Sequence, residues 1–281
     1  MLKFKWFSLS SILSWLIIFT LVPLALMIVV SFLSHTDDQL IVWHFNITNY
    51  SQLISPVYLE IFWRSLWLAV LCSALCLIMA YPIAYIVARQ PERLKNLLLI
   101  FLIIPFWTSS LIRTYAILAL LKTKGLVNAL LLKFGIIHVP LAMLYSTGAV
   151  VFGNVYNLLP FMILPLYANI EKLDYRLLEA AQDLGASKFQ QFFRIVLPLT
   201  VPGIIAGLLL VLLPAMTLFY IPILLGSAKS LLLGNLIQNQ FLLMRDWPAG
   251  AATSVALTAL MLLLVWIYQR ANKGKSNELF T

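Results

Sequence analysis

The sequence predicts an all-α, polytopic membrane protein with six transmembrane helices. Of its 281 residues, 62% are hydrophobic and 10% are charged, whereas a soluble domain is about half apolar and a quarter charged. The mean hydropathy is +0.97. Apolar runs of about 20 residues, the length that crosses the hydrocarbon of a bilayer, recur along the chain. These properties exclude an ordinary soluble globule, a disordered chain and a disulfide scaffold.

The six predicted spans form a single transmembrane domain over 1–281. They lie near 12–32, 63–88, 96–121, 143–170, 199–225 and 249–268. The first run is longer than the roughly 7 to 15 residues of a signal-peptide core, and no small-x-small cleavage site follows it. We therefore expect it to be a retained span. Several spans contain proline, which interrupts the helical hydrogen-bond ladder and offers bending points.

The distribution of basic residues predicts the orientation of the chain. The net charge is +9, but the basic residues lie between apolar runs instead of on one face, which argues against nucleic-acid binding. With the amino terminus inside, the inner segments hold twelve Lys and Arg and the outer loops five. The excess of positive charge on the inner side predicts that both termini are cytoplasmic. The segment 171–198 is then an inner loop.

No motif in the sequence indicates an enzyme, a metal site or a bound cofactor. The phosphate-binding pattern GxxxxGK[ST] does not occur, nor do GxSxG or HExxH, so energy for any active process must come from another subunit. Cys72 and Cys76 lie four residues apart in one apolar run. This spacing is not a CxxC pair, and we interpret both as packing residues.

The inner segment 171–198 has the periodicity of a short amphipathic helix. Its apolar residues recur three or four positions apart, at Leu173, Leu177, Ala181 and Leu184. Asp174 is placed to cap the start of this helix and Gly185 to end it. An exposed apolar stripe suits a groove on a partner protein. It also suits the inner membrane surface, and the periodicity alone leaves both possibilities open.

The same segment contains a specific motif. Glu179-Ala180-Ala181, Gly185, and Ile195-x-Leu197-Pro198 together form EAA-x3-G-x9-I-x-LP. This pattern resembles the cytoplasmic coupling loop of the ABC importer permeases of the binding-protein-dependent type. The resemblance implies a type I ABC importer permease fold, and a coupling helix that sits in a cleft of an ATPase. The coupling residues are then Asp174, Leu177, Leu178, Glu179, Ala180, Ala181, Asp183, Leu184, Gly185, Ala186, Ile195, Leu197 and Pro198.

Further segments are similar to the spermidine/putrescine permeases of this family. They are IPFWT at 104–108 with LIRTY at 111–115, TKG at 123–125, LPF at 159–161, LPAM at 213–216 and RDWP at 245–248. The resemblance implies a subunit of a bacterial inner-membrane importer that moves polyamines by alternating access. It also implies three partners: a second, homologous permease chain, a dimer of cytoplasmic ATPases, and an external polyamine-binding protein. The alternative is an importer of the same class with another cargo, an anion or a metal chelate.

The sequence gives few indications of the transport pathway. Carboxylates are the expected lining for a polycation, but the predicted spans contain no Asp or Glu. Aromatic rings attract amines by about 0.5 to 2 kcal/mol each, and neutral amides can accept hydrogen bonds from them. The candidates are Trp107, Tyr115, Asn154, Tyr156, Asn157, Phe219 and Tyr220, with Asp246 and Trp247 near the outer rim. Helix packing, or an interfacial position for Trp247, is a competing interpretation of these residues. Arg113 would repel a cation, so we expect a structural or gating role for it.

Overall fold

The computed structural model describes residues 12–36, 38–227 and 231–278, and it confirms an all-α fold with six apolar helical segments long enough to cross a membrane. They run over Ile12–Ser31, Pro56–Ala88, Ser110–Lys133, Thr147–Ile170, Lys188–Thr217 and Trp247–Ile267. Four of them overlap the expected spans closely. The ends of the chain, including Lys3 and Lys5 of the charge count, lie outside the described residues.

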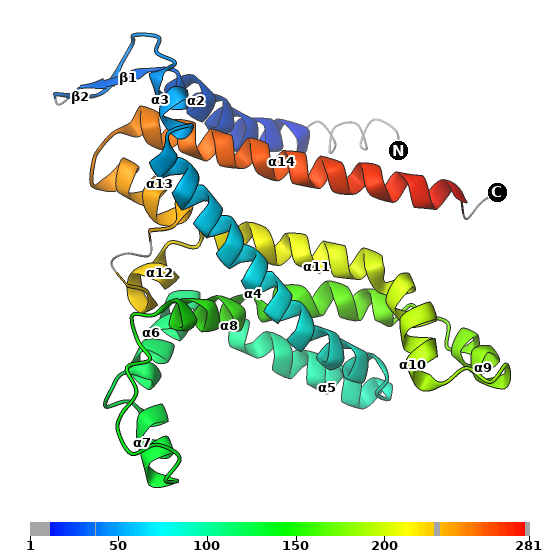
Figure 1. Ribbon diagram of the computed structural model, residues 1–281. Coiled ribbons are helices and arrows are strands. Elements are labelled where there is room, and N and C mark those ends of the chain that lie inside the picture. The colour runs from blue at the N-terminus through cyan, green and yellow to red at the C-terminus, as the bar shows by residue number, and fades with distance from the viewer. Residues whose placement is uncertain (1–11, 37, 228–230, 279–281) are drawn as a thin grey trace. The chain divides into compact units, whose positions relative to one another are not determined.

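The helices and strands follow the chain in a simple order (Figure 1). They are η1 Ile17–Leu21, α2 Val22–Ser31, β1 Ser34–Thr36, β2 Gln39–Val42, α3 Thr48–Leu53, α4 Pro56–Ala88, α5 Glu92–Ile103, η2 Ile104–Trp107, α6 Ser110–Leu121, α7 Leu126–Lys133, α8 Thr147–Ile170, α9 Arg176–Asp183, α10 Lys188–Gln191, η3 Phe192–Val196, α11 Leu197–Thr217, α12 Tyr220–Leu225, α13 Leu233–Leu242 and α14 Trp247–Glu278.

The structure differs from the sequence-based expectation at the third span. A continuous helix over 96–121 is replaced by α5, the short 3-10 turn η2 and α6. Pro105 lies in η2, and Thr108 and Ser109 are extended, with ψ of 144° and 134°. Proline removes a backbone donor and disfavours the helical conformation of the residue before it. The twelve residues of α5 cover only about 18 Å, too little to cross the hydrocarbon.

The fifth span is shifted toward the amino terminus relative to the expected 199–225. Its helix begins at Lys188 and ends at Thr217, so the second half of the expected inner loop is helical. Ser187 and Gln190 form a capping box that starts the helix early. At the other end, Leu218 adopts a ψ of 98° before α12. The Thr217 hydroxyl donates to the Leu213 and Pro214 carbonyls in this last turn.

The described chain forms two compact units by its internal contacts, one from residues up to Ile61 with Leu236–Leu264, and one from Phe62–Asn235 with the residues after Leu264. In the second unit, α8 is the central helix, with 13 of its 24 residues buried. It packs against α11, α6 and α12. Cys72 and Cys76 are free and fully buried in α4, which confirms that they are packing residues.

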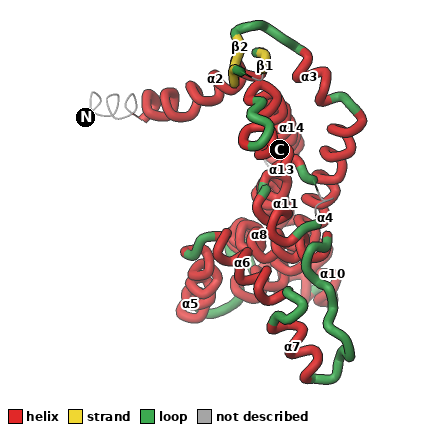
Figure 2. The backbone as a smooth tube through the Cα atoms, turned by 90° about the vertical axis from the view of Figure 1, so that its left-hand side faces the viewer, coloured by secondary structure: helices red, strands yellow, loops and turns green. Residues whose placement is uncertain are grey.

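The first unit contains an unexpected β-hairpin in the polar segment that follows the first span. β1 and β2 pair antiparallel beside the end of α2 (Figure 2). Asn49 in α3 donates from Nδ2 to the carbonyls of Ser31 and Leu33, at 3.1 and 2.9 Å. The Tyr50 and Ser31 hydroxyls lie 2.7 Å apart. These bonds satisfy carbonyls at and just after the end of α2 and hold α3 against it.

The contact between α8 and α11 is the most extensive one between two helices of the second unit (Figure 1). A Cβ atom added at Gly203 would lie 2.6 Å from Cβ of Asn169 and 3.1 Å from the Pro165 carbonyl oxygen. One added at Gly207 would lie 2.5 Å from the Met162 sulfur. The GxxxG pair of the fifth span therefore serves packing within this chain, because only glycine allows the two backbones to approach this closely.

We expect Gly203→Ala to lower the stability of the protein. The added methyl overlaps Asn169 and the rigid Pro165 carbonyl, and overpacking of this kind costs about 1–3 kcal/mol. Thermal unfolding of the purified protein in detergent should show a lower melting temperature. Gly148→Ala is the matched control, because the nearest atom to its added Cβ is the Ser146 hydroxyl at 3.7 Å. Equal melting temperatures for both variants would contradict this packing.

Candidate functional site

The inner segment folds as a short helix whose start is fixed by Asp174. Its Oδ1 accepts a hydrogen bond from the backbone N–H of Arg176 at 3.0 Å. Tyr175 between them already has helical φ and ψ. A side-chain oxygen that accepts from the N–H two residues on is the usual N-terminal cap. The structure thus agrees with the capping position predicted for Asp174.

The end of α9 is fixed by Gly185, which has a φ of +83°. The Gly185 N–H donates to the Gln182 carbonyl at 2.8 Å, and the Ala186 N–H donates to the Ala181 carbonyl at 2.9 Å. This pair of bonds is a Schellman motif, which requires a left-handed residue at the position of Gly185. An added Cβ would meet nothing within 4 Å. Glycine is therefore favoured here by the left-handed backbone conformation, and not by a lack of room for a side chain.

The surface around α9 is open. None of the residues of α9 is buried, although Leu177 and Ala181 lie four residues apart, the spacing of a helix face that packs against another surface. Leu184 is 89% exposed and Phe189 is 73% exposed. Contiguous exposed apolar side chains are typical of surfaces that contact a partner protein or a membrane. Of the predicted coupling residues, Glu179, Ala180, Asp183, Leu184, Gly185 and Pro198 are exposed, and Ala181, Ala186, Ile195 and Leu197 are partly covered.

An ion pair ties the start of this inner segment to α5. Lys95 Nζ donates to Glu171 Oε1 at 2.7 Å, and the Tyr167 hydroxyl bonds to the same carboxylate. The hydrogen bond from Lys95, followed by the one from Tyr167, lowers the pKa of Glu171 below its ordinary value. The bond to Glu171 raises the pKa of Lys95. The pair is therefore charged throughout the neutral range.

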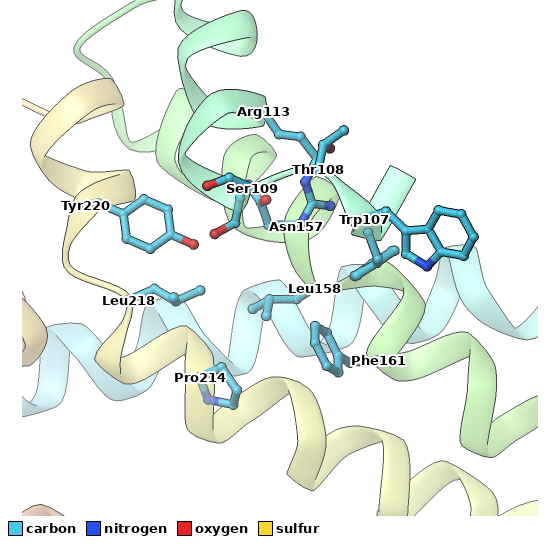
Figure 3. A pocket seen from close by; sticks show the side chains of 12 residues that line it. Trp107, Thr108, Ser109, Arg113, Asn157, Leu158, Phe161, Pro214, Leu218 and Tyr220 are labelled. Carbon is cyan, nitrogen blue, oxygen red and sulfur yellow. The ribbon is translucent and has the colours of Figure 1, made fainter. Parts of the chain in front are cut away.

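A cavity of about 630 Å³ lies between η2, α6, α8 and the end of α11 (Figure 3). Its wall combines aromatic rings with small hydroxyl groups and contains no carboxylate. It is lined by Phe106, Trp107, Thr108, Ser109, Ser110, Arg113, Asn157, Leu158, Phe161, Pro214, Leu218 and Tyr220. The break at Pro105 that divides the expected third span brings five consecutive residues, 106–110, to this wall.

Two polar groups in the wall lack hydrogen-bond partners among the described residues. Asn157 is buried and donates from Nδ2 to the Gly153 carbonyl and to the Thr114 hydroxyl, but its Oδ1 accepts from none of them. The Nε of Arg113 is also buried without a partner. The Arg113 guanidinium carbon lies 4.7 Å from the centre of the Phe106 ring. The Phe106 ring in this wall is thus already in contact with the cationic side chain of Arg113.

The structure brings together three of the nine predicted pathway residues. Trp107, Asn157 and Tyr220 line the cavity (Figure 3). Asn154 is fully buried one turn away, where its Nδ2 donates to the Val150 carbonyl at 3.0 Å. Three predicted aromatic residues are exposed on the outside of this unit and do not line the cavity: Tyr115, Tyr156 and Phe219.

Asp246 and Trp247 belong to the other compact unit and begin α14. Asp246 Oδ1 accepts from the Ala249 N–H at 3.0 Å, which is a helix-capping role. The Trp247 ring contacts Phe241 edge to face, with 6.2 Å between ring centres. Both residues therefore have local structural functions.

Most residues of the cavity wall were not predicted from the sequence. Phe106, Thr108, Ser109 and Phe161 were not predicted, and Arg113 was set aside because a cation repels a cation. Pro105 carried the signal, since a proline followed by Thr108 and Ser109 indicates an interrupted helix. Interrupted helices within a membrane occur where their backbone lines a cavity or is covered by protein.

We expect the Lys95–Glu171 pair to make stability pH-dependent in a defined direction. Because the folded pKa of Glu171 is lowered, its contribution is present above the unfolded pKa of about 4.3 and is lost as the pH falls through the folded value. The Lys95 contribution is present below its unfolded pKa of about 10.4 and is lost at higher pH. Glu171→Gln should lower the melting temperature between these limits, and the difference should vanish on acidification.

A double-mutant cycle provides the control for this pair. Lys95→Gln, Glu171→Gln and the double variant should melt at similar temperatures at neutral pH, because each removes the same bond. Additive losses in the double variant would show that the two residues act separately.

Comparison with known proteins places the chain in a family. The family described as "Binding-protein-dependent transport system inner membrane component" matches residues 80–276. The spermidine/putrescine transport system permease protein PotB of Haemophilus influenzae is 49% identical over 271 residues, covering 96% of this chain and 95% of the relative. PotB of Escherichia coli is 50% identical over 263 residues, covering 94% and 96%.

Solved structures show the same fold. A bacterial ABC transporter involved in the import of the acidic polysaccharide alginate has a chain that matches with a TM-score of 0.76. The match covers 96% of each chain at 19% identity. The chain therefore belongs to the binding-protein-dependent transport system inner membrane components, with the fold of an ABC importer permease.

Proposed function

We propose that this chain is the translocation subunit of an ATP-driven importer that carries polyamines into the cytoplasm. The observation that carries the proposal is the similarity to spermidine/putrescine permeases at 49–50% identity over at least 94% of the chain. The similarity thus extends over both the cavity and the α9 segment, and not over the fold alone. ATP hydrolysis takes place on a partner subunit.

The exposed α9 segment supports the coupling part of this proposal. Its EAA motif lies on a helix that is capped at both ends and has no buried residue. Small side chains at Ala180 and Ala181 let a partner approach the helix backbone closely. Glu179 and Asp183 offer carboxylates for charge-assisted bonds with basic side chains. An ATPase groove fits these properties, with α9 and both termini on the cytoplasmic side.

The cavity supports a cargo that carries amines. Trp107, Phe161 and Tyr220 supply aromatic rings, and the buried Asn157 Oδ1 supplies an acceptor that has no partner among the described residues. Cation–π contacts are worth roughly 0.5–2 kcal/mol each. Several weak contacts hold a flexible polycation without a carboxylate that would trap it. This balance suits a pathway from which the cargo must leave.

Arg113 favours a second class of cargo. A guanidinium in a cavity wall suits an anion better than a cation, and the solved alginate importer shows that this fold occurs in a transporter of an acidic polymer. An anionic cargo is therefore the specific alternative that uptake measurements must include. A metal chelate is the other alternative within the same importer class.

The partners in this proposal are a second permease chain, an ATPase dimer and an external binding protein. The spermidine/putrescine permease PotC of Escherichia coli is 41% identical over 59 residues, 21% of this chain. This short similarity supports a second, homologous but different permease. A periplasmic protein occurs in complex with the solved alginate transporter, which supports a binding protein that delivers the cargo. The coupling motif supports the ATPase.

The cargo is tested by uptake into proteoliposomes that contain this chain with its co-expressed partners. We expect ATP-dependent accumulation of labelled spermidine or putrescine that requires the binding protein. Labelled sulfate should not accumulate. Uptake of sulfate without uptake of either polyamine would assign the cavity to an anion, and uptake without any ATPase would contradict the importer class.

Gly185 provides a test of the coupling segment. We expect Gly185→Ala to reduce uptake, because a residue with a Cβ is strained by about 1–2 kcal/mol in the left-handed conformation at this position. Gly185→Asn should retain more uptake than Gly185→Ala, because Asn tolerates that conformation. The same ranking should appear in ATP hydrolysis stimulated by the binding protein. Equal uptake for Ala and Asn variants would show that the Schellman turn is not needed for coupling.

A further inference from the structure

Three side chains at the inner end of α4 and directly after it lie on one face and contact the inner segment both before and after α9. Tyr81, Tyr85 and Arg89 follow one another at intervals of four residues, which places them on one face of a helix. Arg89 directly follows Ala88, the last residue of α4. This end of α4 is the inner end of the second span in the proposed orientation.

The first contact joins Arg89 to the start of α9. The guanidinium carbon of Arg89 lies 4.2 Å from the centre of the Tyr85 ring and 5.6 Å from the centre of the Tyr175 ring. Tyr175 is the residue directly before α9. The cation is therefore shared between a ring at the end of the second span and a ring at the start of α9. Arginine suits this geometry because its planar group stacks on aromatic faces.

The second contact joins the same face to the helix that follows α9. The Phe192 ring meets the rings of Tyr81 and Tyr85 edge to face, with centres 5.5 and 6.4 Å apart. The Tyr81 hydroxyl lies 2.9 Å from the Thr200 hydroxyl of α11. Phe192 begins the π-helical turn η3, and such turns are frequent at functional sites. Both flanks of α9 thus contact a single face of α4.

Between these contacts the packing is loose. A cavity of about 270 Å³ separates α9 from the end of α4 and from α10, with Leu178, Glu179 and Gln182 in its wall. Close-packed side chains therefore do not fill the space between α9 and α4, and the aromatic contacts at the flanks of α9 connect it to α4. A contact between two rings and a cation can persist while the helix tilts, because it has no fixed hydrogen-bond direction.

We propose that Arg89 and Tyr175 are positioning residues that carry the movement of α9 to the second span. This inference rests on the coupling function proposed above. Its covalent neighbours α8 and α11 carry the movement of α9 into the membrane, and Phe192 after it contacts α4. The Arg89–Tyr175 contact adds a direct connection from the start of α9 to α4, so that three spans respond to one event at the ATPase.

The experiment compares four variants of the complete transporter in proteoliposomes. Tyr175→Leu and Arg89→Gln remove the contact. Tyr175→Phe keeps the ring, and the hydroxyl it removes has no hydrogen-bond partner among the described residues. Arg93→Gln removes an exposed arginine four residues further along the chain. Spermidine uptake and ATP hydrolysis are measured together, and assembly of the complex is checked by size-exclusion chromatography.

We expect Tyr175→Leu and Arg89→Gln to lower the number of spermidine molecules moved per ATP by about two- to five-fold, the factor that corresponds to one exposed cation–π contact. Tyr175→Phe and Arg93→Gln should keep the wild-type ratio. A wild-type ratio in Tyr175→Leu would overturn the inference, as would an equal loss in Tyr175→Phe.

A second measurement does not depend on the cargo. Amide hydrogen exchange over 173–183 in the assembled complex should be about two- to five-fold faster in Tyr175→Leu and Arg89→Gln than in Tyr175→Phe, because the start of α9 is released. Unchanged exchange would overturn the positioning role even if the cargo were not a polyamine. Failure of wild-type spermidine uptake with altered exchange would instead contradict only the proposed cargo.

Discussion

The close approach of α8 and α11 is the constraint on which the site depends. Gly203 and Gly207 allow the two backbones to approach so closely that any added side-chain atom would overlap Asn169 or Met162. The α9 segment is the covalent connection between these two helices. Because the helices cannot separate without losing this contact, we expect a displacement of α9 to move them together. Because α8 and α11 are packed as a pair, a partner protein that binds the short exposed α9 segment acts on both helices.

The cavity depends on a different feature, the interruption of a helix. Pro105 and the extended residues Thr108 and Ser109 between α5 and α6 direct residues 106–110 toward the wall instead of continuing an apolar helix. The wall then offers aromatic rings, hydroxyls and one unpartnered amide oxygen. Arg113 lies over the Phe106 ring, the type of contact that an amine of a polyamine would make. The same wall can therefore hold either a side-chain cation or a cargo cation, but the repulsion between them disfavours both at once.

The sequence predicts the membrane class, four of the six spans and a short helix in the inner segment, because each depends on local patterns. The caps of α9 follow from Asp174 and Gly185, whose effects extend over a few residues of backbone. The cavity could not be predicted to the same extent, since it depends on which helix faces meet in space. Tyr156 and Asn157 are neighbours in α8, yet one is exposed and the other buried. A membrane helix is apolar on all sides, so its sequence does not show which face is buried against other helices.

The central claim is that α9 lies in the cytoplasm and is covered by an ATPase, and site-directed labelling tests it most directly. Leu184→Cys places a thiol at a side chain that is 89% exposed, while the native Cys72 and Cys76 are fully buried. A membrane-impermeant maleimide should label this thiol in inside-out vesicles and not in intact cells, and the assembled ATPase should protect it. Labelling from outside the cell, or labelling that the ATPase does not change, would contradict the account.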